Sequence, residues 1–130
     1  MAKVKICGLS TKETVLTAVK AGAKYIGLVF YPPSPRNVTI NQAAEILATP
    51  YQDILTVGVF VNPSDALLTN VLKVVNLDVI QLHGNEDPER VKYISTRFAK
   101  SVMKEISVSD VSDLNKAKEY ESVCDMLLFD

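Results

Sequence analysis

Four polar side chains follow short apolar runs in this sequence and could do acid–base or ionic chemistry: Cys7, Arg36, His83 and Asp130. A thiol acts as nucleophile or general base only as the thiolate, which is a minor form of an unperturbed cysteine at neutral pH. A helix N-terminus favours the thiolate, and the helix-start signal after Gly8 predicts such a terminus near Cys7. The alternative for Cys7 is a small core residue, since free cysteine is often buried.

The other three side chains also have both a structural and a functional interpretation. His83 is the only histidine, and a lone histidine is commonly a hydrogen-bonded structural residue, but its place at a strand end before Gly84 suits ligand binding. Arg36 is either an exposed surface arginine or a bidentate clamp on a carboxylate or phosphate. Asp130 is either a solvated terminal carboxylate or an acid at the mouth of a strand. Taken singly, each signal is weak.

Apolar runs that alternate with stretches of helical period must position these residues. The runs are nearly all apolar rather than alternating, which is typical of strands buried on both faces of a parallel sheet. Functional loops follow the carboxyl ends of such strands. The predicted strands are Val4–Cys7, Tyr25–Phe30, Thr56–Val61, Val79–Leu82, Val102–Glu105 and Met126–Phe129.

A helix-start signal lies in each gap between these strands. Capping boxes are expected for Ser10 with Glu13 and for Thr39 with Gln42. In the fifth helix we expect the apolar side chains Val111, Leu114 and Ala117 to face inward. The predicted N-caps are Ser10, Thr39, Ser64, Asp87 and Ser109.

Two α/β architectures fit this order of elements. An open doubly wound sheet is complete in about 130 residues, whereas a (β/α)8 barrel typically has about 250. Length alone favours the open sheet. The sixth strand counts against it, because an apolar strand needs cover on both faces and no helix follows Asp130.

Composition excludes several classes of protein. The 130 residues are 48% hydrophobic and 22% charged, with a net charge of −1, which argues against a nucleic-acid partner and against disorder. No apolar run approaches the roughly 20 residues of a membrane span, and the N-terminus lacks a signal-peptide core. We therefore expect a single cytoplasmic domain over residues 1–130 with no membrane partner. Two cysteines are too few to indicate a disulfide scaffold.

Phosphate-binding and metal-binding signatures are also missing from the sequence. There is no glycine-rich phosphate fingerprint and no histidine or cysteine pair with the spacing of metal ligands. A phosphorelay receiver domain has this length, but it needs an acidic cluster after the first strand and a phospho-accepting aspartate after the third. Cys7-Gly8 and Asn62 stand at those places, so that class is rejected.

Four segments together resemble one family. They are Lys5–Gly8, Gly27–Pro32 followed by Ser34–Arg36, Val57–Asn62, and Gln81–Gly84. In this order and spacing they are similar to the phosphoribosylanthranilate isomerases of tryptophan biosynthesis, and the resemblance covers the whole chain. The first segment alone would be weak evidence, whereas four segments in register are strong evidence.

The resemblance implies a (β/α)8 TIM-barrel fold of about 200 residues with no metal or cofactor. It implies an isomerase of the intramolecular oxidoreductase class that acts on a small phosphorylated substrate. The reaction is the Amadori rearrangement of N-(5-phosphoribosyl)anthranilate to 1-(2-carboxyphenylamino)-1-deoxyribulose 5-phosphate. Carried over by motif, Cys7 is the general base, Asp130 the general acid and Arg36 the partner of the anthranilate carboxylate. His83 is expected to bind substrate, with no more specific role.

The sequence departs from the family pattern after Asp130. The family continues with two further βα units, whose loops hold the substrate phosphate. We therefore expect a barrel truncated after the sixth parallel strand, with open edges at its first and last strands, and little or no activity for this chain alone. A second copy or a missing C-terminal segment would cover those edges.

Two other functions compete with this one. A non-catalytic remnant or interaction module would assemble through the open sheet edges. A small open-sheet binding domain of flavodoxin type explains the length but not the four segments.

Overall fold

The computed structural model describes residues 3–48 and 51–130, in which strands and helices alternate along the chain. The strands are β1 (Lys5–Cys7), β2 (Tyr25–Val29), β3 (Leu55–Phe60), β4 (Val79–Leu82), β5 (Ser101–Ile106) and β6 (Met126–Phe129). The helices are α1 (Lys12–Lys20), α2 (Ile40–Ile46), α3 (Asp65–Val74), α4 (Pro88–Phe98) and α5 (Val111–Tyr120). All six predicted strands are confirmed, with ends that differ by one residue at most.

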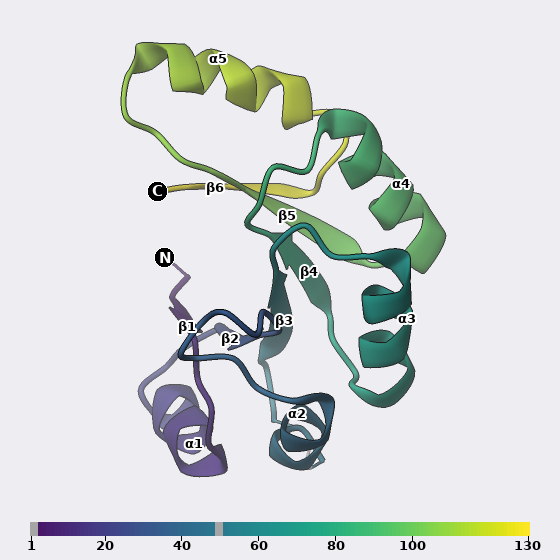
Figure 1. The fold of residues 1–130 in the computed structure, drawn as a ribbon. Helices are drawn as coiled ribbons and strands as arrows, with labels where there is room; N and C mark the ends of the chain where they lie inside the picture. Colours follow the sequence, from purple (N-terminus) through teal and green to yellow (C-terminus); the bar gives the residue numbers. More distant parts are fainter. Residues whose placement is uncertain (1–2, 49–50) are drawn as a thin grey trace.

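The strands form one parallel sheet in the order β1-β2-β3-β4-β5-β6. The sheet is curved, and the helices lie on its convex side (Figure 1). A doubly wound sheet would reverse its strand order at a switch point and carry helices on both faces. Here each right-handed crossover leads to the next neighbouring strand, so every helix falls on the same side. The length argument for an open doubly wound sheet is therefore wrong, and the structure is part of a βα barrel.

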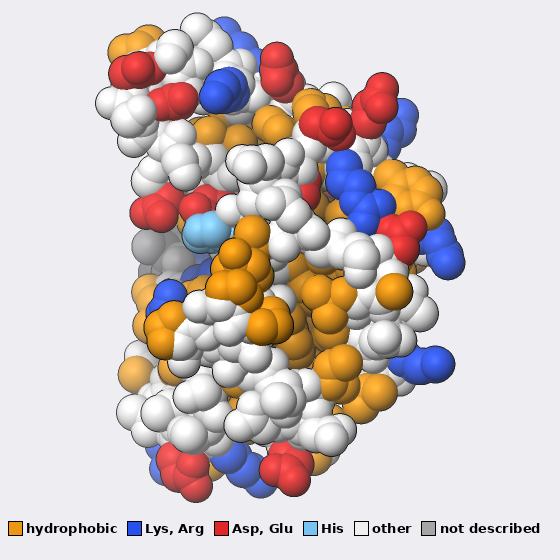
Figure 2. Space-filling model, in the orientation of Figure 1, with side chains coloured by type: hydrophobic (Ala, Val, Ile, Leu, Met, Phe, Trp, Pro, Cys, Tyr) orange, Lys and Arg blue, Asp and Glu red, His pale blue; other side chains and the backbone are white. Residues whose placement is uncertain are grey.

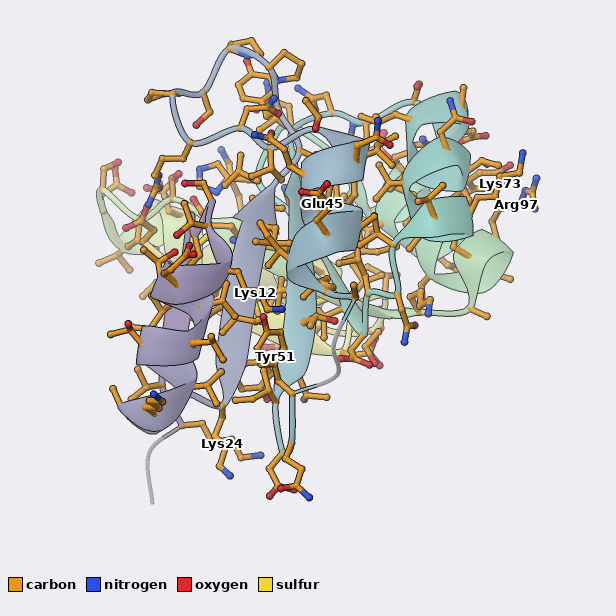
Figure 3. All side chains as sticks on the ribbon, turned by 90° about the horizontal axis from the view of Figure 1, so that it is seen from below. Lys12, Lys24, Glu45, Tyr51, Lys73 and Arg97 are labelled. Atoms are coloured by element: carbon orange, nitrogen blue, oxygen red, sulfur yellow. The ribbon has the colours of Figure 1, made fainter. Side chains whose placement is uncertain are left out.

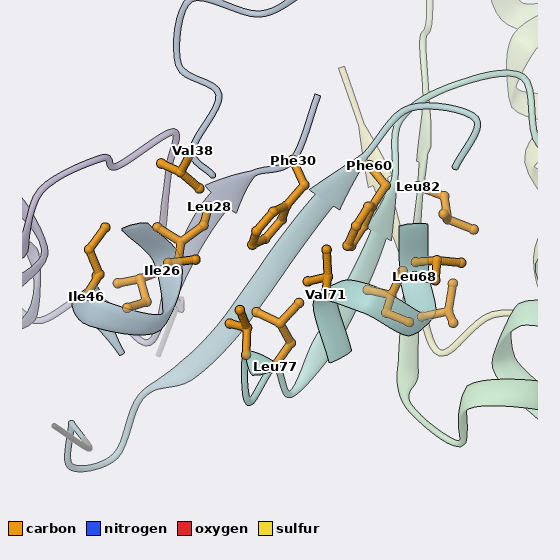
Figure 4. Close-up of a cluster of buried hydrophobic side chains, with 14 of the residues drawn as sticks. Ile26, Leu28, Phe30, Val38, Ile46, Phe60, Leu68, Val71, Leu77 and Leu82 are labelled. Atoms are coloured by element: carbon orange, nitrogen blue, oxygen red, sulfur yellow. The ribbon is translucent and has the colours of Figure 1, made fainter. Parts of the chain in front are cut away.

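Side chains that point outward from the sheet pack beneath the helices. Ile26, Leu28 and Phe60 are completely or almost completely buried there, and the rings of Phe30 and Phe60 stack with centroids 5.3 Å apart (Figure 4). Leu77 fills the space beside them. The convex side therefore holds the larger hydrophobic core.

Gly58 allows this core to close around β3. A Cβ atom at this position would lie 2.4 Å from Leu77 Cδ1 and 2.9 Å from Phe60 Cε2. Such distances are far inside van der Waals contact, so any side chain at this outward position of β3 would displace Leu77 and Phe60.

The concave side of the sheet has a smaller apolar layer. Val57, Val59, Val79 and Met103 pack there against one another. Adjacent strands place Val57 beside Val79 and Gln81 beside Met103. Because side chains alternate between the two faces of a strand, the residues two positions further along face the open end of the same concave surface.

Three of the predicted helix starts are confirmed. Thr39 forms a capping box with Gln42, and Ser64 and Asp87 accept hydrogen bonds from backbone N–H groups in the first turns of α3 and α4. These contacts satisfy N–H groups that have no partner within a helix. Gly22, with a φ of +96°, follows α1 as expected of a helix-ending glycine.

Two predicted caps are wrong by one residue. Thr11, not Ser10, caps α1 and forms its capping box with Thr14. Asp110, not Ser109, caps α5, and Asp113 closes that box. Each site has two adjacent residues that are able to cap, and the position of the buried helix face decides between them.

The inward face predicted for α5 is only partly confirmed. Ala117 is buried, but Val111 is 76% exposed and Leu114 is 46% exposed. The helix contacts β5 and α4, and these contacts use only the flank that carries Ala117. No element of residues 3–48 or 51–130 covers the other flank.

Charged side chains lie on the outer surface of the helix layer. Lys12, Glu45, Lys73 and Arg97 are exposed, and Figure 3 shows Lys73 and Arg97 directed away from the sheet. Lys73 and Arg97 stand in the last turns of α3 and α4, where positive charge interacts favourably with the helix dipole. None of the helices in the described part of the chain has both the length and the apolar character needed to cross a bilayer.

Candidate active site

A cavity of about 400 Å³ lies on the concave side of the sheet, at the carboxyl ends of the strands. All four predicted site residues line it: Cys7, Arg36, His83 and Asp130. In the space-filling view, acidic, basic and histidine side chains gather on the open side of the curve (Figure 2). The other polar residues of the lining are Lys5, Tyr31, Ser34, Gln81 and Glu105.

The curvature of the sheet brings its two edges to this one cavity. Cys7 ends β1 and Asp130 directly follows β6, and these strands lie at opposite ends of the strand order. The backbone of Asp130 continues the parallel ladder, since its N–H donates to the carbonyl of Ile106 at 3.0 Å. The first and last strands thus contribute one cavity residue each.

A glycine on the neighbouring strand leaves room for the Cys7 thiol. Cys7 pairs with Gly27 of β2 in the sheet register. A Cβ atom on Gly27 would lie 3.1 Å from Cys7 Sγ, closer than ordinary contact. The thiol is free and partly accessible, so it is open to a molecule in the cavity.

Arg36 reaches Cys7 from the proline-containing loop after β2. The loop folds back on its own strand, where Val38 N–H donates to the Val29 carbonyl at 2.9 Å. Arg36 Nη1 then donates to the Cys7 carbonyl at 3.2 Å. Gly8, with a φ of +78°, lies so close that a Cβ there would be 2.4 Å from Arg36 Nη1. The glycine after Cys7 therefore allows the guanidinium to lie over the end of β1.

His83 is paired with a buried carboxylate on the next strand. Its Nδ1 contacts Oε2 of Glu105, and its own backbone N–H donates to the Phe60 carbonyl at 2.9 Å. Glu105 is buried while the His83 ring is partly exposed. The pairing leaves the other ring nitrogen, Nε2, available to the cavity.

The surroundings of Glu105 change its acidity. Burial raises the pKa of the Glu105 carboxyl above its usual value, and the negative charge of Asp130 acts in the same direction. The charges of His83, Lys104 and Lys5 act in the opposite direction without cancelling the effect. In the sequence, Glu105 is the last residue of a predicted strand. Its position two residues after the inward-facing Met103 is the signal that places it on the concave side.

A second buried ion pair fixes the loops around the cavity from the convex side. Lys104 Nζ donates to Glu86 Oε1 at 2.8 Å and to the Gly84 carbonyl at 2.7 Å. The Glu86 carboxylate also accepts from the backbone N–H groups of Asn62 at 2.8 Å and Gly84 at 3.0 Å. These bonds join the loops after β3 and β4, so they hold the segment that carries His83.

Cys124 lies away from the cavity. It precedes β6, and its Sγ donates to the Tyr120 carbonyl at 3.1 Å. Burial raises the pKa of the Cys124 thiol, which favours the inert protonated form. This placement agrees with a structural interpretation of Cys124.

Known proteins resemble this chain in both sequence and structure. The sequence model of the N-(5'-phosphoribosyl)anthranilate (PRA) isomerase family matches residues 4–130. The N-(5'-phosphoribosyl)anthranilate isomerase of Paramagnetospirillum magneticum is 51% identical over 128 residues, which cover 98% of this chain and 60% of that protein. The corresponding isomerase of Paracoccus denitrificans is 50% identical, over 98% of this chain and 59% of that protein.

Two solved structures superpose on the whole chain. A phosphoribosyl anthranilate isomerase in complex with reduced 1-(o-carboxyphenylamino)-1-deoxyribulose 5-phosphate is 35% identical, with a TM-score of 0.92, and the match covers 65% of that protein. Monomers made from the dimeric isomerase of Thermotoga maritima are 36% identical, with a TM-score of 0.88 and 66% coverage. The chain spans about 60% of the length of the curated relatives. Over that span its fold and sequence agree with theirs, and the chain belongs to the N-(5'-phosphoribosyl)anthranilate isomerase family.

Proposed function

We propose that this chain supplies the acid–base groups of a phosphoribosylanthranilate isomerase. The observation that carries the proposal is the shared cavity, in which Cys7 and Asp130 arrive from opposite edges of the sheet and Arg36 contacts the Cys7 backbone. The substrate would be N-(5-phosphoribosyl)anthranilate, and the product 1-(2-carboxyphenylamino)-1-deoxyribulose 5-phosphate.

The proposed chemistry is a series of proton transfers that begins at the ring oxygen and at C2, which are both bonded to C1 of the sugar. The Asp130 carboxyl donates a proton to the ring oxygen, which opens the ribose and leaves an iminium at C1. The iminium makes the C2 hydrogen acidic, and the Cys7 thiolate removes it. The resulting enolamine tautomerises to the ketone. Positioned acid–base groups typically contribute about 10² to 10⁴-fold to such steps.

Arg36 and His83 are proposed to orient the substrate. One N–H of the Arg36 guanidinium is used on the Cys7 carbonyl, and the guanidinium has five donors, so others remain for the anthranilate carboxylate. This would place the aromatic acid beside Cys7. His83 would present Nε2 to the ligand, because Glu105 holds Nδ1.

The 130 residues alone are expected to turn over slowly or not at all. In barrels of this type the phosphate is held by the loops after the seventh and eighth strands, and the described residues provide the first six. Without that binding energy, the reacting carbons are poorly positioned between acid and base.

A turnover assay tests the proposal, with loss of substrate fluorescence as the signal. The chain is measured alone and with a separate C-terminal fragment of a homologous isomerase. We expect activity with the fragment, and a loss of at least about 100-fold in Cys7→Ala and in Asp130→Asn. Cys124→Ala is the matched cysteine control and should keep the reconstituted rate. Undiminished rates in both site variants would disprove the assigned roles.

The second candidate is a non-catalytic module that assembles through its sheet edges. Within the described residues β1 pairs only with β2, and β6 only with β5, so each has a row of unpaired backbone groups that can bind another strand. Light scattering coupled to size exclusion would detect such assemblies. A well-folded monomer at high concentration would count against this candidate.

A further inference from the structure

Gln81 is a polar residue in a position that should be apolar. It lies on the concave side of β4, lines the cavity, and is only 2% exposed. Its side-chain oxygen Oε1 is buried and has no hydrogen-bond partner among residues 3–48 and 51–130. Buried polar atoms nearly always have a partner, so an exception asks for an explanation.

In the part of the chain that the structure describes, no neighbour of Gln81 donates a hydrogen bond to Oε1. Val59 and Met103 lie beside it on β3 and β5 in the sheet register. Val79 precedes it on the same face of the strand and is apolar, and the Nδ1 of His83, which follows it, is paired with Glu105. Gln81 as a residue lines the cavity, and a turn of its carboxamide about the last side-chain bond, a soft torsion, would present Oε1 to a ligand there.

We propose that Gln81 binds the hydroxylated sugar chain of the substrate, with Oε1 accepting a hydrogen bond from a hydroxyl group. This inference rests on the proposed function. In a molecule that joins anthranilate to a phosphorylated sugar, the carboxylate and the ionised phosphate offer acceptors, and they would repel a carbonyl oxygen. The donors are the sugar hydroxyls and the amine N–H.

The position of Gln81 suits the middle of such a ligand. Arg36 and Cys7 lie at the β1 side of the cavity, while Gln81 comes from β4, in the centre of the sheet. A carboxylate bound by Arg36 would place the aromatic ring near β1 and lead the sugar chain across the central strands. A site built around a hydroxyl discriminates strongly against ligands that lack it, because the buried acceptor is then left unpaired.

Two glutamine variants separate a ligand-binding role from a structural one. Gln81→Met keeps the length of the side chain and removes the unpaired oxygen. Gln42→Met is the matched control, since Gln42 Oε1 accepts the Thr39 N–H at 2.8 Å in the cap of α2. Without ligand, we expect Gln81→Met to unfold at the same temperature as the wild type or higher, and Gln42→Met to unfold at a lower temperature.

Binding is measured by anthranilate fluorescence in the presence of the C-terminal fragment of a homologous isomerase, with reduced 1-(o-carboxyphenylamino)-1-deoxyribulose 5-phosphate and with anthranilate alone. We expect Gln81→Met to bind the sugar-containing ligand at least about tenfold more weakly and anthranilate equally well. Gln42→Met should bind both ligands as the wild type does. Anthranilate carries the amine but no hydroxyl, so it separates the two kinds of donor.

Each other outcome overturns a distinct part of the inference. A clearly lower unfolding temperature of Gln81→Met would make the carboxamide a structural group. Unchanged affinity for the sugar-containing ligand would remove Gln81 from the site while leaving the proposed function intact. If Gln81→Met weakened the binding of both ligands equally, the donor to Oε1 would be the amine and not a hydroxyl. If the wild-type chain together with the C-terminal fragment binds neither ligand, the proposed function fails and this inference fails with it.

Discussion

On the convex side of the sheet, Ile26, Leu28 and Phe60 lie buried beneath the helices in an apolar layer. On the concave side, the apolar layer lies further toward the amino ends of the strands, and polar residues such as Gln81 and Glu105 follow it at the carboxyl ends. The convex face therefore supplies most of the hydrophobic stabilisation, and the concave rim supplies the groups that can act on a ligand. Neighbouring residues on one strand belong to different faces, so paired substitutions can test this division.

The largest expected effect comes from Phe60 on the convex face. Phe60→Ala should lower the free energy of unfolding by about 3–5 kcal/mol, because it removes a buried ring and leaves a cavity. Val59→Ala, its neighbour on the concave face, should cost about 1 kcal/mol. Urea denaturation followed by circular dichroism measures both. Equal costs would contradict the proposed difference between the faces.

The two strand glycines should separate stability from activity. Gly58→Ala places a Cβ 2.4 Å from Leu77 Cδ1, and overpacking of this kind costs about 1–3 kcal/mol. Gly27→Ala instead crowds Cys7 Sγ at 3.1 Å. We expect it to affect stability less and to lower the turnover of the reconstituted isomerase by about tenfold, because it displaces the thiol.

Both variants are measured by urea denaturation and in the assay with the added C-terminal fragment. The reverse pattern, with Gly27→Ala the less stable protein and Gly58→Ala the less active one when fully folded, would refute the assignment of the two faces.

Glu105 should make the concave face sensitive to pH. Because burial raises the pKa of the folded Glu105 carboxyl above its ordinary value of 4.5, the folded state binds more protons than the unfolded state above that pH. Stability should therefore fall as pH rises from about 4.5 through the raised pKa. Glu105→Gln lacks this titration, so its stability should exceed that of the wild type increasingly across the same range. Urea denaturation at a series of pH values tests this, and parallel curves for the two proteins would contradict it.

The strands could be predicted from the sequence, because each is a continuous apolar run between turn and cap signals. The sequential strand order was implied by the family resemblance, since alternation of strands and helices is common to doubly wound sheets and barrels. The caps at Ser10 and Ser109 were each misplaced by one residue. Thr11 and Asp110, the residues that follow them, are equally able to accept a capping hydrogen bond and are the caps in the structure. Tertiary packing selects between such adjacent candidates.

The four site residues were brought together as expected, but other polar residues of the cavity, among them Glu105 and Gln81, were not predicted as site residues. Lys104 and Glu105 are adjacent in sequence, yet the first binds Glu86 on the convex side and the second binds His83 in the cavity. Only the register of β5 against its neighbours decides which of them faces inward. Gln81 is recognisable for the same reason only after its two flanking strands are known.

The smallest expected effect concerns α5, which contrasts with α3 on the same convex side. Leu68 of α3 is fully buried, and Leu68→Ala should cost about 2–5 kcal/mol. Val111 of α5 is 76% exposed, so Val111→Ser should change the free energy of unfolding by no more than about 0.5 kcal/mol. The two helices thus differ in how much of their apolar surface the fold uses. A loss of stability in Val111→Ser that approaches that of Leu68→Ala would mean that this flank of α5 is covered in solution, because an exposed valine has no buried surface to lose.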